Sequence, residues 1–123
     1  MLVVLCGGSG TRMSQDSLPK PLTLMMAQPV LAHALRAVAP LVPEILFVYS
    51  RHLASFNFEQ VVVNLFKSTR CTFVVVDFHT RGAVETALVG VLACERLADG
   101  EPLVFVDNDN VYPASLADTE TFL

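Results

Sequence analysis

The sequence is poor in charge and carries no excess of positive charge. Of its 123 residues 16% are charged, the eight Lys and Arg residues are scattered, and the formal net charge is −4. A nucleic-acid-binding protein normally presents a broad basic face, so we expect no nucleic-acid partner. The chain also lacks low-complexity tracts and runs of like charge, and 53% of it is hydrophobic, which argues against disorder.

Long hydrophobic runs are absent too, so none of the chain is expected to cross a bilayer. The apolar N-terminus lacks the basic leader and the small-residue cleavage site of a signal peptide. Cys6, Cys71 and Cys94 are widely spaced and form no CxxC pair. We therefore expect buried free thiols rather than a metal or redox site, in a soluble cytoplasmic protein with no membrane partner.

Four short apolar runs predict strands. They are rich in β-branched and aromatic residues and are apolar on both faces, which is typical of central strands in a parallel sheet. These runs lie at Leu2–Cys6, Glu44–Ser50, Cys71–Phe78 and Pro102–Val106.

Helical periodicity predicts three helices between these strands. Pro29 is suited to begin the first helix and Pro40 to stop it. A second helix is expected over residues 56–66, although Val61–Val63 favours a strand. For the third, Thr80 is suited to cap the start and Gly100 follows the end. The first helix is marked by Val30, Leu31, Ala34, Leu35 and Val38, and the third by Val84, Ala87, Leu88, Val91, Leu92 and Glu95.

This alternation predicts an α/β fold with one domain over residues 1–123. Parallel strands joined by right-handed crossovers give a Rossmann-like, mainly parallel sheet in a three-layer α/β/α arrangement. Ligands of such sheets bind at the carboxyl ends of the strands. Three of the four predicted strand ends carry unusual polar sequences.

The first strand ends in the glycine loop LCGGSGTRM. Gly7, Gly8 and Gly10 allow positive φ and close presentation of backbone N–H groups, which suits a polyphosphate, although a tight turn needs glycine as well. No GxxxxGK[ST] spacing is present, which disfavours a P-loop. Met13 stands where the dinucleotide fingerprint requires its third glycine.

A long polar segment with Arg12 and Lys20 follows the glycines. Pro19 and Pro21 flank Lys20. Each proline fixes its own φ and lacks a backbone N–H donor, so we expect a stiff, non-helical backbone around the lysine. A lysine on such a rigid backbone is consistent with a cation that is directed at a phosphate. A surface lysine in a proline turn is the alternative.

The last predicted strand ends in VFVDNDNVYP. Asp107 and Asp109 are separated by one residue, and their carboxylates are hard ligands suited to Mg²⁺ bridging to a nucleotide phosphate. A turn rich in Asp and Asn, stabilised by its own side chains, is the alternative.

The third predicted strand leads into DFHTRGAVETAL. Gly82 permits close backbone approach, and the following helix N-terminus offers free N–H groups to a ligand. The side chains considered for ligand contacts here are Asp77, His79 and Arg81. His33, in the first helix, and His52, in a loop, are expected to be structural.

The joint pattern resembles the sugar-phosphate nucleotidyltransferase family, the sugar-nucleotide pyrophosphorylases. The resemblance rests on a strand, GGSGTRM, PKPL, QPVLAHAL and a later strand ending in Asp, and it runs from Leu2 to about Pro113. The spacer SQDSLPKPL is similar to the N-acetylglucosamine-1-phosphate uridylyltransferase branch. RGAVETAL is similar to the GAAET stretch of capsule-type members.

The resemblance implies attack by a sugar 1-phosphate on the α-phosphorus of a nucleoside triphosphate, with release of pyrophosphate. Arg12 would neutralise the β- and γ-phosphates, Lys20 would reach the α-phosphate, and Asp109 would bind Mg²⁺. The residues implied in nucleotide binding are Gly7, Gly8, Gly10, Thr11 and, beside the base, Gly82.

Two departures from the family leave alternatives open. Thr80 stands where the uridylyltransferase branch has glutamine, so the base is unassigned. Family members are roughly twice as long, so we expect a homodimer or a completing C-terminal segment. The alternative functions are a non-catalytic nucleotide- or sugar-nucleotide-binding regulatory module, and cytidylyltransferase-like transfer to another phosphorylated alcohol.

Overall fold

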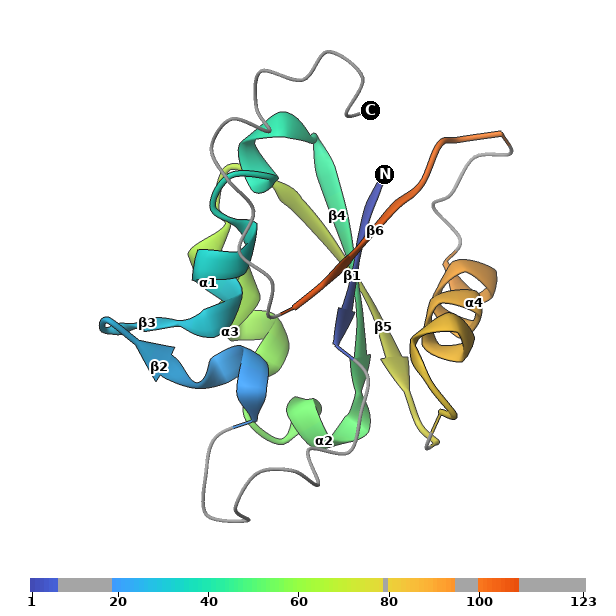
Figure 1. Cartoon of the computed structure of the whole chain (residues 1–123), viewed down its shortest axis with the longest axis horizontal. Helices are drawn as coiled ribbons and strands as arrows, with labels where there is room; N and C mark the ends of the chain where they lie inside the picture. The colour runs from blue at the N-terminus through green and yellow to red at the C-terminus, as the bar shows by residue number, and fades with distance from the viewer. Residues whose placement is uncertain (7–18, 79, 95–99, 109–123) are drawn as a thin grey trace.

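The computed structural model describes residues 1–6, 19–78, 80–94 and 100–108. Within these ranges a four-stranded parallel sheet has the strand order β5-β4-β1-β6. Figure 1 shows α1 and α3 on one side of the sheet and α4 on the other. The predicted three-layer, mainly parallel α/β/α architecture is therefore confirmed. The strands are β1 (Leu2–Cys6), β4 (Glu44–Ser50), β5 (Arg70–Val76) and β6 (Val104–Asp107).

Two of the four strands differ from the prediction at their ends. β5 stops at Val76 instead of Phe78, because its neighbour β4 ends at Ser50, the partner of Val76, and the chain there turns into a helix. β6 begins at Val104, opposite Leu2, so its pairing follows the start of β1 rather than the apolar run from Pro102.

Helix α1 (Val30–Leu35) is shorter than the predicted first helix. Pro29 directly precedes the helix instead of opening it. The helix ends before Val38, whose N–H bonds to the carbonyl of Leu35 (3.1 Å) in a tighter turn. A 3₁₀ helix, η2 (Ala39–Leu41), follows and contains Pro40, so the expected stop occurs several residues earlier than the proline.

The predicted second helix is present as α3 (Phe58–Leu65), with the Val61–Val63 run inside it. It is preceded by an element that the sequence prediction missed, the four-residue helix α2 (Arg51–Ala54). His52 therefore lies in a helix and not in a loop, and its ring packs against Phe56 at a centroid distance of 5.5 Å.

The third predicted helix is α4 (Ala83–Ala93). Its N-cap is Gly82, and Thr80 makes no capping bond, so the predicted cap is wrong. Gly100 has φ +79°, in the left-handed region that favours glycine. None of the helices in the described ranges is long and apolar enough to cross a membrane.

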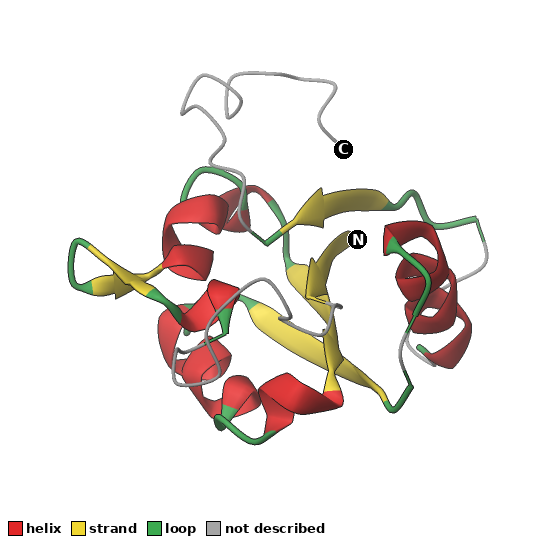
Figure 2. Ribbon diagram, turned by 60° about the horizontal axis from the view of Figure 1, so that its bottom comes forward, coloured by secondary structure: helices red, strands yellow, loops and turns green. Residues whose placement is uncertain are grey.

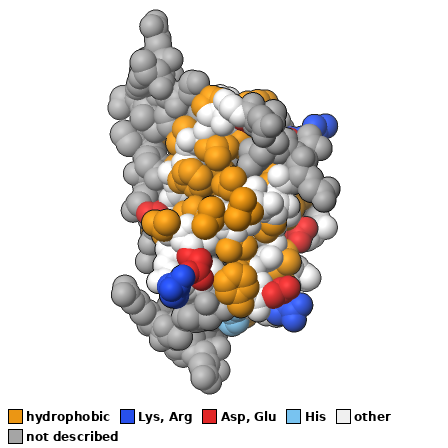
Figure 3. Space-filling model, turned by 90° about the vertical axis from the view of Figure 1, so that its right-hand side faces the viewer, with side chains coloured by type: hydrophobic (Ala, Val, Ile, Leu, Met, Phe, Trp, Pro, Cys, Tyr) orange, Lys and Arg blue, Asp and Glu red, His pale blue; other side chains and the backbone are white. Residues whose placement is uncertain are grey.

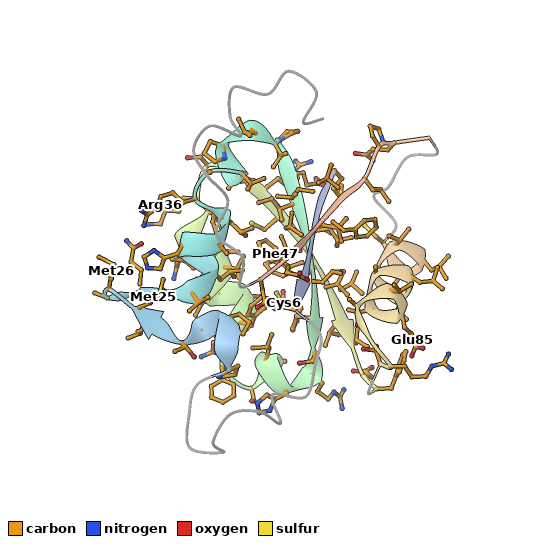
Figure 4. The ribbon with its side chains drawn as sticks, viewed as in Figure 1. Cys6, Met25, Met26, Arg36, Phe47 and Glu85 are labelled. Carbon is orange, nitrogen blue, oxygen red and sulfur yellow. The ribbon has the colours of Figure 1, made fainter. Side chains whose placement is uncertain are left out.

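A small antiparallel hairpin, β2 (Leu24–Met25) and β3 (Gln28–Pro29), projects beside α1. Figure 2 shows it extending away from the main sheet, and Figure 4 shows Met26 at its tip. His33 fixes the hairpin to the helix: its Nε2 donates to the Met25 carbonyl (2.6 Å), and its Nδ1 accepts from Arg36 Nη2 (3.2 Å). His33 is thus structural, as predicted.

The two faces of the sheet carry different cores. On the α1 and α3 face, aromatic rings surround Phe47, which Figure 4 shows between the sheet and these helices. The ring of Phe47 lies 5.7 Å from that of Phe73 and 6.2 Å from that of Phe58. The α4 face has a smaller cluster of buried residues: Val3, Leu46, Val48 and Val76.

Candidate functional site

Because the four strands are parallel, their carboxyl ends lie at one edge of the sheet, the lower edge in Figure 1. This edge is held together by side chains from neighbouring strand ends. Arg51, directly after β4, pairs through Nε with Asp77 Oδ1, directly after β5, at 3.1 Å. Both side chains are mostly exposed, so this ion pair contributes little to the stability of the fold.

The ends of β1 and β6 are joined by a hydrogen bond. Asn108 Nδ2 donates to the backbone carbonyl of Leu5 at 3.0 Å. Asp107 is the register partner of Leu5 in the parallel pairing of β6 with β1. The chain that continues into Asp109 is therefore fixed against the strand that continues into Gly7.

Lys20 begins the 3₁₀ helix η1 (Lys20–Leu22), so the prediction of a non-helical chain through this lysine is wrong. The turn is closed by the N–H of Leu22, which donates to the Pro19 carbonyl at 2.9 Å. Neither proline needs to donate in such a turn, which explains why both are tolerated. Pro19 and Pro21 are buried and η1 contacts α1, so this turn is packed against the rest of the fold.

Gly82 lies at the N-terminus of α4, at the same edge of the sheet. Its backbone is extended (φ 164°), a conformation that any residue adopts, and a Cβ added there would meet nothing within 4 Å. Neither the backbone nor the packing within the described residues therefore requires glycine. The open space beside it is compatible with a ligand that approaches the backbone closely.

Thr86 holds the segment before α4 in place. Its hydroxyl contacts the hydroxyl of Thr80 at 2.7 Å and the carbonyl of Gly82 at 3.1 Å, and the residue is only 2% exposed. Thr80 thus takes part in bracing the loop around Gly82 instead of capping the helix. Sequence reasoning missed Thr86, whose only signal is a hydroxyl within an apolar helix.

Two other side chains considered for ligand contacts are engaged in ion pairs. Arg81 Nε lies 2.7 Å from Glu85 Oε2, one turn into α4, and the Arg81 side chain is 91% exposed. The hydrogen bond to Arg81 lowers the pKa of Glu85 and raises that of Arg81. Asp77 is the partner of Arg51. His79 lies outside the described residues.

Cys6 closes β1 directly before the glycine loop. It is 2% exposed, and this burial raises the pKa of its thiol, an effect that the hydrogen bond with Asn108 partly offsets. The thiol therefore stays protonated and supplies neither a nucleophile nor a negative charge beside the loop. Cys6 is a buried free thiol as predicted, whereas Cys71 and Cys94 are free but only half-buried.

The remaining predicted site residues lie outside the described residues. The described part of the chain contains no group of three or more His, Cys, Asp or Glu side chains arranged around a common metal position. The residues that fall outside are Gly7, Gly8, Gly10, Thr11, Arg12 and Asp109.

The model of the MobA-like NTP transferase domain matches residues 2–118. The chain belongs to this NTP transferase family. The match includes the glycine loop, PKPL and the sequence positions of Asp107 and Asp109, so these predicted motifs lie inside the family's domain.

Curated relatives of this NTP transferase domain include the bifunctional protein GlmU of Jannaschia sp. strain CCS1, which is 47% identical over 51 residues. GlmU of Cereibacter sphaeroides strain ATCC 17025 is 51% identical over the same length. These matches cover 42% of this chain and 11% of either relative. The chain thus aligns with about a tenth of the relatives' length.

Solved structures share the fold over nearly the whole chain. The nucleoside-diphosphate-sugar pyrophosphorylase of Vibrio cholerae RC9 superposes with a TM-score of 0.74 at 17% identity, covering 93% of this chain and 49% of that one. A UDP-glucose pyrophosphorylase complexed with UDP-glucose gives 0.69 at 17% identity, covering 95% and 50%. The NTP transferase chain therefore spans half the length of these structures.

Proposed function

We propose that this chain is the nucleotide-binding half of a nucleotidyltransferase that transfers a nucleoside monophosphate from a nucleoside triphosphate to a sugar 1-phosphate, releasing pyrophosphate. The observation that carries the proposal is the Asn108 to Leu5 hydrogen bond. It fixes the start of the acidic turn against the strand that enters the glycine loop. Membership of the NTP transferase family supports transfer from a triphosphate.

The chemistry follows from charge. A sugar 1-phosphate oxygen attacks the α-phosphorus, and the bond from that phosphorus to the bridging oxygen of pyrophosphate breaks. Two anions must meet in line, so positioning and neutralisation of charge dominate the barrier. Arg12 neutralises the leaving pyrophosphate, and Lys20, on its buried proline turn, neutralises the α-phosphate.

The acidic turn after β6 has the donor chemistry that Mg²⁺ requires. Mg²⁺ uses one or two protein carboxylates and takes its other ligands from water and substrate phosphates, so a cluster of three protein ligands is unnecessary. Asp109 is the proposed ligand, and Asp107 lies at the exposed end of β6. When bound there, the ion would offset charge on the triphosphate.

Gly82 is proposed to lie against the nucleobase. The absence of protein atoms around a Cβ at this position, among the residues that the structure describes, supports this role, because the space is open without being needed for packing. Thr80 and Thr86 are positioning residues, since their shared hydrogen bond braces the backbone on either side of the glycine.

The test is pyrophosphate release from each nucleoside triphosphate with a panel of sugar 1-phosphates, measured for this chain and for any longer polypeptide encoded by its reading frame. We expect Lys20→Ala to lower kcat by about a hundredfold or more, the usual cost of removing a charge that stabilises the transition state. Gly82→Ala should leave the fold intact and raise KM for the nucleotide.

Lys67→Ala is the matched control. Lys67 is the only other lysine of the chain, is exposed, and precedes β5 at the opposite edge of the sheet. Its removal should leave kcat and KM unchanged. Undiminished turnover in Lys20→Ala would refute the mechanism, and tight nucleotide binding without turnover in every polypeptide would favour a binding module.

A further inference from the structure

The end of β4 lies between two segments that the proposed function assigns to the nucleotide. The strand order β5-β4-β1-β6 places β4 beside β1, which leads into the glycine loop, and beside β5, which leads toward Gly82. Adjacent strands are about 4.8 Å apart, so the ends of β1 and β5 are separated by roughly 10 Å, close to the length of a nucleoside. A residue that directly follows β4 is therefore placed between the phosphate side and the base side of a bound nucleotide.

Arg51 is that residue, and its guanidinium is exposed but held in place. The side chain is 76% exposed, and its Nε lies 3.1 Å from Asp77 Oδ1. Because Asp77 directly follows β5, the ion pair holds the guanidinium toward the part of the edge that leads to Gly82. The two Nη groups have no hydrogen-bond partner within the described residues, so they remain as adjacent N–H donors that a ligand can reach.

The same two strands carry a second arginine ion pair at their opposite ends. Arg70, the first residue of β5, has its Nη1 3.9 Å from Oε1 of Glu44, the first residue of β4. The Glu44 side chain is only 13% exposed, so Arg70 offsets a largely buried carboxylate. Asp77 is 62% exposed and needs no such partner. The pair of Arg51 with Asp77 therefore acts mainly by orienting the guanidinium.

The surface near the carboxyl ends of the strands differs from the centre of the α4 face. Figure 3 shows hydrophobic side chains gathered over the centre of that face and most of the charged side chains below them, toward the edge where the strands end. Charged side chains at this edge can make directed hydrogen bonds to a ligand, which the apolar centre of the face cannot.

A guanidinium held in this way can discriminate between nucleobases. Its two adjacent donors bind best to two adjacent acceptors on one edge of a base. Guanine has such a pair in N7 and O6, and cytosine has one in O2 and N3. Adenine and uracil have no two adjacent acceptors, because a donor or a C–H group stands beside each acceptor on their free edges.

We propose that Arg51 reads the nucleobase and favours nucleotides of guanine and cytosine over those of adenine and uracil. Asp77 is the positioning residue that fixes the plane of the guanidinium. The inference rests on the proposed function, because it takes the glycine loop as the phosphate site and Gly82 as the base site. It deepens that function by naming the class of nucleotide.

The test is equilibrium binding of GTP, CTP, ATP and UTP in the presence of Mg²⁺, measured by isothermal titration calorimetry. The unsubstituted chain should bind at least one of GTP and CTP about tenfold or more tightly than ATP and UTP, which is the discrimination that a paired contact to a base provides. Arg51→Ala should remove most of this preference and leave the affinities for ATP and UTP nearly unchanged. Turnover is not needed as a readout.

Arg51→Lys separates base recognition from charge. Lysine keeps the positive charge but lacks the forked donors, so this variant should lose the base preference as the alanine variant does. Asp77→Ala should reduce the preference without abolishing the binding of ATP. Arg70→Ala is the matched control: Arg70 is 65% exposed on the same pair of strands at the opposite edge, and its removal should leave all four affinities unchanged. Circular dichroism checks that each variant is folded.

The outcomes separate this inference from the proposed function. Binding of no nucleotide by the unsubstituted chain would overturn the proposed function and, with it, the role of Arg51. Nucleotide binding that is unchanged in Arg51→Ala would overturn the role of Arg51 alone, as would a preference for ATP or UTP. An equal loss for all four triphosphates that Arg51→Lys restores would overturn base recognition in favour of a phosphate contact.

Discussion

The two faces of the sheet differ in how completely they are buried. On the α1 and α3 face, Phe47, Tyr49 and Phe58 have exposed fractions of 0–4% and pack ring against ring. On the α4 face, a short row of aliphatic residues lies under one helix whose outer side is as apolar as its inner side. The first face has a finished core, whereas the second has a core and an unpartnered outer surface within the described part of the chain.

The two faces should therefore respond differently to substitution. Substitutions in the aromatic core should affect folding of the 123-residue chain directly. Substitutions on the outer side of α4 should have little effect, because the side chains there are exposed. Four sets of variants test this difference between the two faces, from the largest expected effect to the smallest.

Phe47→Ala should have the largest effect. Removal of a fully buried phenylalanine costs about 3–5 kcal/mol in the free energy of unfolding, and here three rings lose their neighbour. Urea denaturation followed by circular dichroism measures the loss. Leu46→Ala is the control, because Leu46 is equally buried and points to the α4 face.

We expect Leu46→Ala to cost about 2 kcal/mol, the lower end for such substitutions, because leucine is smaller than phenylalanine and no contact between aromatic rings is lost. A loss for Leu46→Ala that equals or exceeds that for Phe47→Ala would contradict the difference between the two faces.

Gly90→Ala should destabilise the contact between α4 and the sheet. The new Cβ would lie 2.3 Å from Val48 Cγ2, so the helix or the Val48 side chain must shift. Overpacking costs about 1–3 kcal/mol, and the better helix propensity of alanine returns about 1 kcal/mol, so a net loss of up to about 2 kcal/mol is expected in thermal or urea unfolding.

Combining Gly90→Ala with Val48→Ala provides the decisive comparison. The smaller side chain at position 48 makes room for the new methyl group, so the double variant should lose less than the sum of the two single losses, by about 0.5–3 kcal/mol. Additive losses would show that the close approach of Gly90 to Val48 does not hold α4 in place.

Tyr49, on the α1 and α3 face, should make the free energy of unfolding depend on pH in the alkaline range. Burial, then the hydrogen bond to Glu59 and the charge of that carboxylate, raise the pKa of the Tyr49 hydroxyl above its ordinary value of 10.0. Below pH 10 both the folded and the unfolded chain hold the proton. Above it only the unfolded chain releases the proton, so stability should fall with rising pH by up to about 1.4 kcal/mol per pH unit.

Unfolding free energies measured between about pH 9 and pH 11, on either side of the ordinary tyrosine pKa, should show this fall, and Tyr49→Phe should flatten it. Glu59→Gln is the control: it removes the charge but keeps Tyr49 buried, so most of the slope should persist. An identical slope in Tyr49→Phe and the unsubstituted chain would mean that another group controls the alkaline transition.

The strands and the α/β order could be predicted because each depends on a local run of apolar residues. The end of β5 could not, because it is set by where β4 ends. The tight turn at Met26 and Ala27, both at positive φ, contains neither of the residue types, Asn and Gly, that signal such turns. The contact of Asn108 with Leu5 joins residues 103 positions apart and leaves no local pattern.

The orientation of α4 is the hardest feature to predict. Its periodic row of Val84, Leu88 and Leu92 identifies a helix, but a second apolar side around Gly90 competes for the sheet. The glycine side is the one buried, because its missing Cβ allows the helix to approach Val48 closely. The periodicity is thus sufficient to predict the helix and insufficient to predict the side that it buries.

Leu88→Gln should have the smallest effect in the 123-residue chain. Leu88 is 56% exposed, and substitutions at such surface positions usually change stability by less than about 0.5 kcal/mol. Val63→Gln on α3, at 45% exposure, should behave alike in the same urea titration. A loss above about 1 kcal/mol for Leu88→Gln would mean that other residues bury this side chain, because an amide costs stability only when burial removes its water.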